Sequence, residues 1–162
     1  MTNTTVLPGT VQAAAPNSNG FDTVSTISPT VATAFINSGY SFCIRYLSLG
    51  ATQQDLSYNE ALGILNAGLA LSVVQRTWKE FIWTANAQLG TSTGANAANN
   101  AKSIGLPQGM VVWCDLETPD PASGAQGVID FCQAWYAQVK AAGYVPGLYV
   151  GAGCLLTSQQ LY

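Results

Sequence analysis

The stretch MVVWCDLE, residues 110–117, is a short apolar run that ends in two acids. Its apolar part is continuous rather than alternating, which is typical of a strand covered on both faces and therefore of a parallel sheet. Val128, Phe131 and Trp135 then repeat at helical spacing until Gly143, a residue type that commonly closes a helix. The stretch thus predicts a strand followed by a helix that packs against it.

The same unit recurs along the chain. Four further apolar runs predict strands at residues 20–22, 41–47, 69–75 and 146–150. Start and stop signals separate them: a cap with proline at Ser28-Pro29, capping boxes at 57–60 and 123–126, and closing glycines at 39, 68 and 105. A weak helix is expected from about Thr93 to Ile104, and a last one near Thr157. Five alternations of strand and helix predict an α/β fold with a parallel sheet, whose strands end at one shared rim.

Composition excludes several classes of function. Lys and Arg number five and the net charge is −3, so nucleic-acid binding is not expected. Histidine is absent, which removes Ser-His-Asp and Cys-His pairs and every His-ligated metal site. The sequence has neither a Gly-x-Gly-x-x-Gly strand-to-helix turn nor a Gly-Lys-[Ser/Thr] motif, so no cofactor is expected.

No membrane span is predicted, because the longest apolar stretch, residues 61–74, is shorter than the roughly 20 residues needed. Residues 1–18 lack a basic start and a continuous apolar core, so no signal peptide is visible. They are predicted to form a flexible polar arm. The compartment is not defined by the sequence, and an extracellular or cell-envelope setting is favoured.

The four cysteines do not form a disulfide framework. Cys43, Cys114, Cys132 and Cys154 show no CxxC spacing. Buried free thiols are the favoured interpretation, and one bridge between Cys114 and Cys132 is the alternative.

The acids at strand ends are the candidate catalytic residues. Asp115 and Glu117 are two positions apart, so their side chains project from the same face of the strand. Like charge on an apolar strand raises at least one pKa, and a protonated acid beside an ionised one suits glycoside hydrolysis. Asp22 ends the first strand and should share the rim. The non-catalytic alternative is that these acids cap helices or face solvent. A Mg²⁺ or Ca²⁺ site is a further option.

Aromatic side chains near the rim are candidates for stacking on sugar faces. Trp78 and Trp83 fall in the polar stretch after the third strand, and Tyr46 and Tyr149 lie at strand ends. The alternative for each is packing that anchors a loop. Arg45 lies within an apolar run and needs a partner, for which a rim acid is expected, so it is included among the candidate substrate-binding residues.

These segments resemble a known family. Gly20-Phe21-Asp22, Ile44-Arg45-Tyr46-Leu47, residues 112–117 and Gly147-Leu148-Tyr149 resemble the bacterial and fungal glycoside-hydrolase-like domain of unknown function, over about residues 19–155. That family is similar to the family 25 glycoside hydrolases, lysozyme-type muramidases with a TIM-like barrel. The resemblance implies a (β/α) barrel-type domain at 19–162, of which the first five βα units are present.

The resemblance also implies roles for the acids. Glu117 matches the general acid, Asp115 the carboxylate that orients an N-acetyl group or stabilises a cationic transition state, and Asp22 the first-strand acid of the same cleft. The muramidase pattern has a further acid on a late strand, for which this chain offers no candidate. The implied activity is hydrolysis of an N-acetylated polysaccharide such as peptidoglycan. The alternative is a non-catalytic module that binds a cell-wall glycan or serves a secreted or phage-like assembly.

Five units leave a barrel of eight strands incomplete. Strands one and five are then expected to be open edges, and the inner faces to lie bare, with Val73, Val112 and Leu148 as candidates for exposure. Either the remaining barrel strands or other chains would cover the open side. The helical start at 157–162 favours the first of these explanations.

Overall fold

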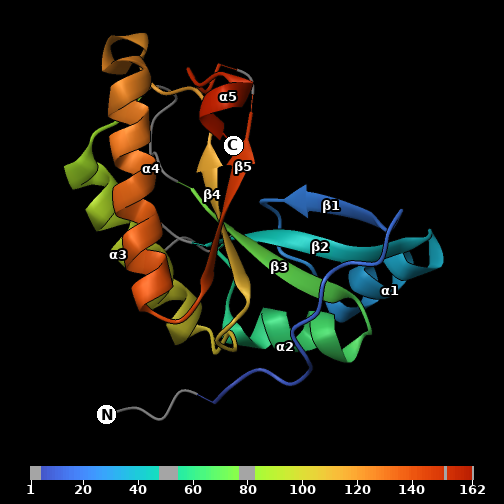
Figure 1. Cartoon of the computed structure of the whole chain (residues 1–162). Coiled ribbons are helices and arrows are strands. Elements are labelled where there is room, and N and C mark those ends of the chain that lie inside the picture. Colours follow the sequence, from blue (N-terminus) through green and yellow to red (C-terminus); the bar gives the residue numbers. More distant parts are fainter. Residues whose placement is uncertain (1–4, 48–54, 77–82, 152, 162) are drawn as a thin grey trace.

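Five strands form one parallel sheet in the order β1-β2-β3-β4-β5 in the computed structural model (Figure 1). The structure describes residues 5–47, 55–76, 83–151 and 153–161. The strands are β1 (Asn19–Thr23), β2 (Tyr40–Leu47), β3 (Ala70–Gln75), β4 (Val111–Leu116) and β5 (Val145–Val150). Each lies within one residue of the range predicted from its apolar run, so the prediction of a parallel five-stranded α/β fold is confirmed.

The connecting helices are α1 (Pro29–Asn37), α2 (Tyr58–Asn66), α3 (Ala87–Ser103), η1 (Pro121–Ser123), α4 (Gly124–Ala141) and α5 (Ser158–Leu161). The predicted caps of the first two helices form. Ser28 accepts a hydrogen bond from the N–H of Val31, and Ser57 accepts one from the N–H of Glu60. Within the described residues, no helix combines the length and apolarity needed to cross a membrane.

Two helix starts differ from the sequence expectation. α3 begins at Ala87 rather than near Thr93, because Asn86 caps it by accepting a hydrogen bond from the N–H of Leu89 at 2.8 Å. Ser123 does not cap α4; its hydroxyl accepts from the N–H of Ala85 at 2.9 Å instead. The serine of the expected second capping box therefore joins two loops near the carboxyl end of the sheet.

The helices cover the outer face of the sheet (Figure 1). Val73 and Val112 pair in register on that face and are fully buried. The expectation that they lie bare is wrong, because alternation along the strands directs these side chains toward the helices rather than toward the inner face. Leu148 is partly buried against the same core.

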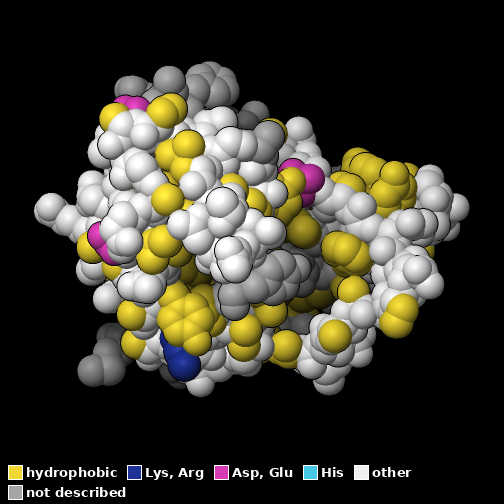
Figure 2. All heavy atoms as spheres, turned by 45° about the horizontal axis from the view of Figure 1, so that its top comes forward, with side chains coloured by type: hydrophobic (Ala, Val, Ile, Leu, Met, Phe, Trp, Pro, Cys, Tyr) yellow, Lys and Arg dark blue, Asp and Glu magenta, His cyan; other side chains and the backbone are white. Residues whose placement is uncertain are grey.

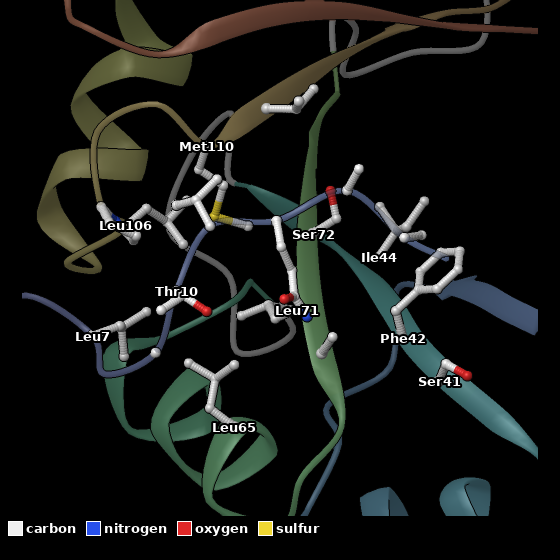
Figure 3. A pocket seen from close by; sticks show the side chains of 18 of the residues that line it. Leu7, Thr10, Ser41, Phe42, Ile44, Leu65, Leu71, Ser72, Leu106 and Met110 are labelled. Carbon is white, nitrogen blue, oxygen red and sulfur yellow. The ribbon is translucent and has the colours of Figure 1, made fainter. Parts of the chain in front are cut away.

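The inner face of the sheet is open and carries an apolar cavity of about 720 Å³ (Figure 3). Phe42 and Ile44 of β2 and Met110 line it, together with residues 7–15 of the N-terminal arm. The arm has an anchor that its polar composition did not predict: Leu7 is 3% exposed, and its N–H donates to the carbonyl of Gly105 at 2.8 Å. Among the described residues no strand extends the sheet beyond β1 or β5, so a closed barrel is not observed.

All four cysteines are free thiols, and the alternative bridge between Cys114 and Cys132 does not form. Burial raises the pKa of the Cys43 thiol to about 12 and that of Cys132 to about 11. Burial also raises the pKa of Cys114 well above its ordinary value. These thiols therefore stay protonated and pack as small apolar side chains.

Helices α3 and α4 pack side by side through glycine (Figure 1). At Gly90, a Cβ atom would overlap the backbone of Phe131 on α4, and at Gly94 it would lie 2.8 Å from the carbonyl oxygen of Trp135. α3 is otherwise rich in Ala, Thr, Ser and Asn and has no wide apolar stripe. Its packing against α4 therefore depends on the close approach of the two backbones. This packing holds the second half of the sheet's outer layer together.

Replacing Gly94 with Ala is expected to destabilise the protein by about 1–3 kcal/mol through overpacking. The same change at an exposed helical glycine would stabilise the protein by up to about 1 kcal/mol. The sign of the stability change therefore distinguishes a glycine in close contact from an exposed one. Chemical denaturation of Gly94→Ala measures the effect, with Ser92→Ala on the exposed side of α3 as the control. A Gly94→Ala variant at least as stable as the parent would contradict the close contact.

Candidate active site

The inner face carries a row of polar side chains at the carboxyl ends of the strands. Asp22 pairs in register with Ile44, two residues before Tyr46 on the same face of β2. Asp115 pairs with Tyr149 across β4 and β5. Because parallel strands end at one edge, alternation in four strands brings these side chains to the same rim. Glu117 follows β4 by one residue and keeps the face of Asp115.

Contacts and charges join these residues into one cluster. The hydroxyl of Tyr46 donates a hydrogen bond to Oδ2 of Asp22 at 3.3 Å. The pKa of Tyr46 is raised, first by burial and then by the charges of Asp115 and Asp22. The pKa of Tyr149 is also raised by burial and then by Asp22, Glu117 and Asp115. Tyr149 therefore interacts with all three candidate acids, and Tyr46 with Asp22 and Asp115. This carboxylate rim, defined by Asp22, Asp115 and Glu117, is the candidate site.

Asp115 is the most strongly perturbed acid of the rim. It is 2% exposed, and burial raises its pKa from 3.8 to about 7. The charge of Glu117 is the next contribution and acts in the same direction, as does that of Asp22, whereas Arg76 lowers the pKa. The expectation of a raised carboxyl pKa in this pair is thus met at Asp115. Burial and the charge of Glu117 therefore favour the protonated form of Asp115 in the free protein.

Glu117 lies closer to solvent and is held from two sides. A Cβ atom at Gly151 would overlap the Glu117 carboxyl group, so the glycine provides the space that this side chain fills. The backbone carbonyl of Glu117 accepts a hydrogen bond from the indole N–H of Trp83 at 2.7 Å. The position of the acid therefore depends on neighbours outside β4.

Trp83 has a different role from the one expected. Its side chain packs against Phe131, with ring centroids 4.7 Å apart, and the residue is 7% exposed. The ring is therefore not presented for stacking on a sugar, and its contribution is to fix the chain after β4. Trp78, the companion candidate, lies outside the described residues.

Arg45 does not reach the rim acids. It alternates with Tyr46 and points to the outer face, where it is fully buried and its Nε donates to Oε1 of Glu60 at 2.7 Å. Its Nη1 donates to the carbonyl of Thr23 at 2.6 Å, and the N–H of Ile27 donates to Glu60 at 2.8 Å. The expected pairing with a rim acid is wrong, and a role for Arg45 in substrate contact is not supported. Glu60, explained at first by helix capping, is its partner.

Arg76 is a member of the site that the sequence analysis missed. Its guanidinium carbon lies 5.0 Å from the centroid of the Tyr46 ring, and its charge lowers the pKa of Asp115. The available signal was its place directly after the third strand, in the alternation of Ser72 and Val74 that faces inward. Figure 2 shows how sparse charged side chains are on the face it draws, which makes this grouping distinctive.

The metal option is not supported. The described residues contain no group of three Cys, Asp or Glu side chains arranged to hold a metal ion.

Residues 33–161 match the model of a family described as the Rv2525c-like, glycoside hydrolase-like domain. The chain belongs to this family. The resemblance to a glycoside-hydrolase-like domain is thereby confirmed, and the matched region contains the rim residues except Asp22. No curated protein sequence matches the chain.

Two solved structures share the fold. An uncharacterized B. stearothermophilus protein superposes with a TM-score of 0.62 at 22% identity, over 79% of this chain and 58% of that one. A sugar phosphate isomerase/epimerase from Parabacteroides distasonis superposes with a TM-score of 0.57 at 14% identity, over 86% and 53%. The chain thus spans little more than half of each. These similarities support a TIM-barrel-like arrangement of its βα units.

Replacing Glu60 with Gln should destabilise the protein by about 3–5 kcal/mol, because it leaves the buried Arg45 without its counter-charge. Denaturant titration of the variant measures the loss. The double variant Arg45→Met/Glu60→Gln is expected to recover much of it, since no unpaired charge is then buried. A loss of unfolding free energy below about 1 kcal/mol in Glu60→Gln would show that the ion pair contributes little to stability.

Asp115 should make stability fall as the pH rises. Its pKa is about 7 in the folded chain and about 3.8 when unfolded, so the folded state binds more protons between these values. Stability from this group is present below about pH 4 and is lost as the pH rises through about 7. Thermal unfolding of the parent and of Asp115→Asn across this window isolates the contribution. Identical pH dependence in both proteins would show that Asp115 titrates normally.

Proposed function

We propose that this domain acts on a glycan, by hydrolysing glycosidic bonds in an N-acetylated polysaccharide such as peptidoglycan. Membership of a glycoside hydrolase-like family supports the glycan, and the carboxylate rim supports the chemistry. We further propose that the domain is similar to the family 25 muramidases and that it works outside the cell or in the cell envelope. The polysaccharide is the partner of this reaction.

The observation that carries the proposal is the unequal pair of acids at the end of β4. Asp115 is buried and its pKa is raised, whereas Glu117 lies beside it nearer to solvent. Burial favours the protonated form of Asp115, so this carboxyl can carry a proton near neutral pH beside the more accessible Glu117. One protonated and one ionised carboxyl are what cleavage of a glycosidic bond requires.

The proton must reach the more accessible acid for the reaction to proceed. In the free protein Asp115 holds it, because burial opposes its charge. A bound sugar would exclude water from Glu117 and raise its proton affinity in turn. The proton then passes to Glu117, which donates it to the leaving oxygen as general acid. Asp115, now ionised, stabilises the positive charge that develops on the sugar.

Asp22 and the tyrosines complete the site in this proposal. Asp22 is exposed on β1, and its carboxylate accepts a hydrogen bond from Tyr46, which holds it beside that tyrosine at the rim. Tyr46 and Tyr149 lie beside the acids at the rim, where a ring and a hydroxyl can both meet a sugar. Their part is to bind and orient the glycan.

A non-catalytic function is the second candidate, favoured by the open inner face. The apolar cavity of about 720 Å³ lies over β2, β3 and β4 beside the N-terminal arm, and no further strand of the described part of the chain extends the sheet beyond β1 or β5. A module that binds a cell-wall glycan, or that serves as part of a secreted or phage-like assembly, could use this face for contact with other polypeptide. In that case the rim would bind a glycan without cleaving it.

Replacing Glu117 with Gln should abolish hydrolysis, since the amide keeps the shape of the acid but cannot donate a proton. Clearing of cell-wall suspensions and release of reducing sugar measure the activity. General-acid catalysis contributes about 10²–10⁴-fold, so the expected loss is of that order.

The control is Asp130→Asn, which removes one acid from α4, away from the rim. It should leave hydrolysis and folding unchanged. Equal activity of Glu117→Gln and the parent would contradict the proposed acid. Cell-wall binding by a parent chain that releases no sugar would instead establish the non-catalytic module.

A further inference from the structure

Arg76 is a cation at the rim to which the proposed reaction assigns no step. The register of β3 and β4 ends with Gln75 opposite Cys114, so Arg76 comes next to Asp115. Its guanidinium lies over the ring of Tyr46, at 5.0 Å from the centroid. The aromatic face beneath the guanidinium limits where this long side chain can go, and its charge acts on the buried Asp115.

Several neighbours of Asp115 oppose its charge. Asp22 on β1, Glu117 after β4, Tyr46 on β2 and Tyr149 on β5 all face it, and Cys114 lies next to it on the other face of β4. Each of these groups is negative when it is charged. Burial acts in the same direction. Among the described residues, the group shown to favour the ionised form of Asp115 is Arg76.

We propose that Arg76 is a positioning residue of the rim, whose guanidinium, seated on the Tyr46 ring, holds Asp115 ready to give up its proton. In the proposed reaction, Asp115 must become an anion while Glu117 takes the proton. A fixed cation beside Asp115 lowers the free-energy cost of that transfer, because it stabilises the product charge without having to move. This consequence for the rate rests on the proposed function, whereas the effect on Asp115 itself does not.

The experiment is a carbon-13 NMR titration of the Asp115 carboxyl in the full chain, with the signal assigned by its loss in Asp115→Asn. Arg76→Met keeps an unbranched side chain on the Tyr46 ring and removes the charge. The Asp115 midpoint should then move upward from its parent value of about 7. Arg76→Lys retains a cation, so its midpoint should lie between those of the parent and Arg76→Met.

Lys140→Met is the matched control. Lys140 also lies over a tyrosine ring, with its Nζ 5.2 Å from the centroid of Tyr136, but on the exposed side of α4. This variant likewise removes one positive charge over a tyrosine ring, but away from the rim, so its Asp115 midpoint should equal that of the parent. Arg76→Gln provides a second neutral replacement with the same expected upward shift, and its use covers the case in which Arg76→Met does not fold.

An Asp115 midpoint that stays in place or falls in the neutral Arg76 variants overturns the proposal. The titration gives this answer whether or not the protein cleaves a glycan. If the parent is active, Arg76→Met should also lower kcat with a smaller change in KM and shift its pH profile upward. A parent chain with no hydrolysis but an upward shift in Arg76→Met would reject the proposed function and support the role of Arg76.

Discussion

The buried ion pair between Arg45 and Glu60 fixes the carboxyl ends of the first two strands. It links β2 to α2, and the same two side chains take up the carbonyl of Thr23 and the N–H of Ile27 as the chain leaves β1. Two buried charges are stable only with this full set of partners. Since Arg45 and Tyr46 point to opposite faces, a pair on the outer face determines where the inner-face tyrosine meets Asp22.

The rim gathers charge in a chain that has little of it. Only thirteen residues are Asp, Glu, Lys or Arg, and three acids and one arginine of these meet at the ends of three strands, β1, β3 and β4. A parallel sheet produces this concentration because each strand brings its last inward side chain to one edge. Burial then raises the pKa of Asp115, so a carboxyl group that is ordinarily ionised can hold a proton at this edge of the sheet.

The sequence predicted the strands and the acids better than the pairing of charges. Continuous apolar runs define strands regardless of context, and the spacing of Asp115 and Glu117 fixes their shared face. Strand alternation alone already set Arg45 on the face opposite Tyr46, so a rim acid was not available to it. The partner of Arg45 is Glu60, fifteen residues further along the chain on α2. The capping motif at the start of that helix already accounted for Glu60. Local signals therefore concealed a tertiary contact.

The start of α3 and the position of the Trp83 side chain could not be predicted from the sequence for a different reason. α3 has almost no apolar stripe, so periodicity located only its second half, and the asparagine cap before it went unrecognised. Trp83 follows a polar stretch that resembles an exposed loop, yet its ring lies against Phe131, far along the chain. Which aromatic residue enters a core is decided by the space left by other elements, and a single sequence does not contain that information directly.

The glycine contact between α3 and α4 has a consequence for the order of folding. Two glycines and many small polar residues make α3 a poor helix on its own, because each glycine costs about 1 kcal/mol relative to alanine. Short helices in water depend on packing for their stability. During synthesis α3 emerges before α4, whose backbone it needs. We therefore expect α3 to remain unstructured on the ribosome until α4 has been made. In this half of the outer layer, the later helix would form first and α3 would then fold against it.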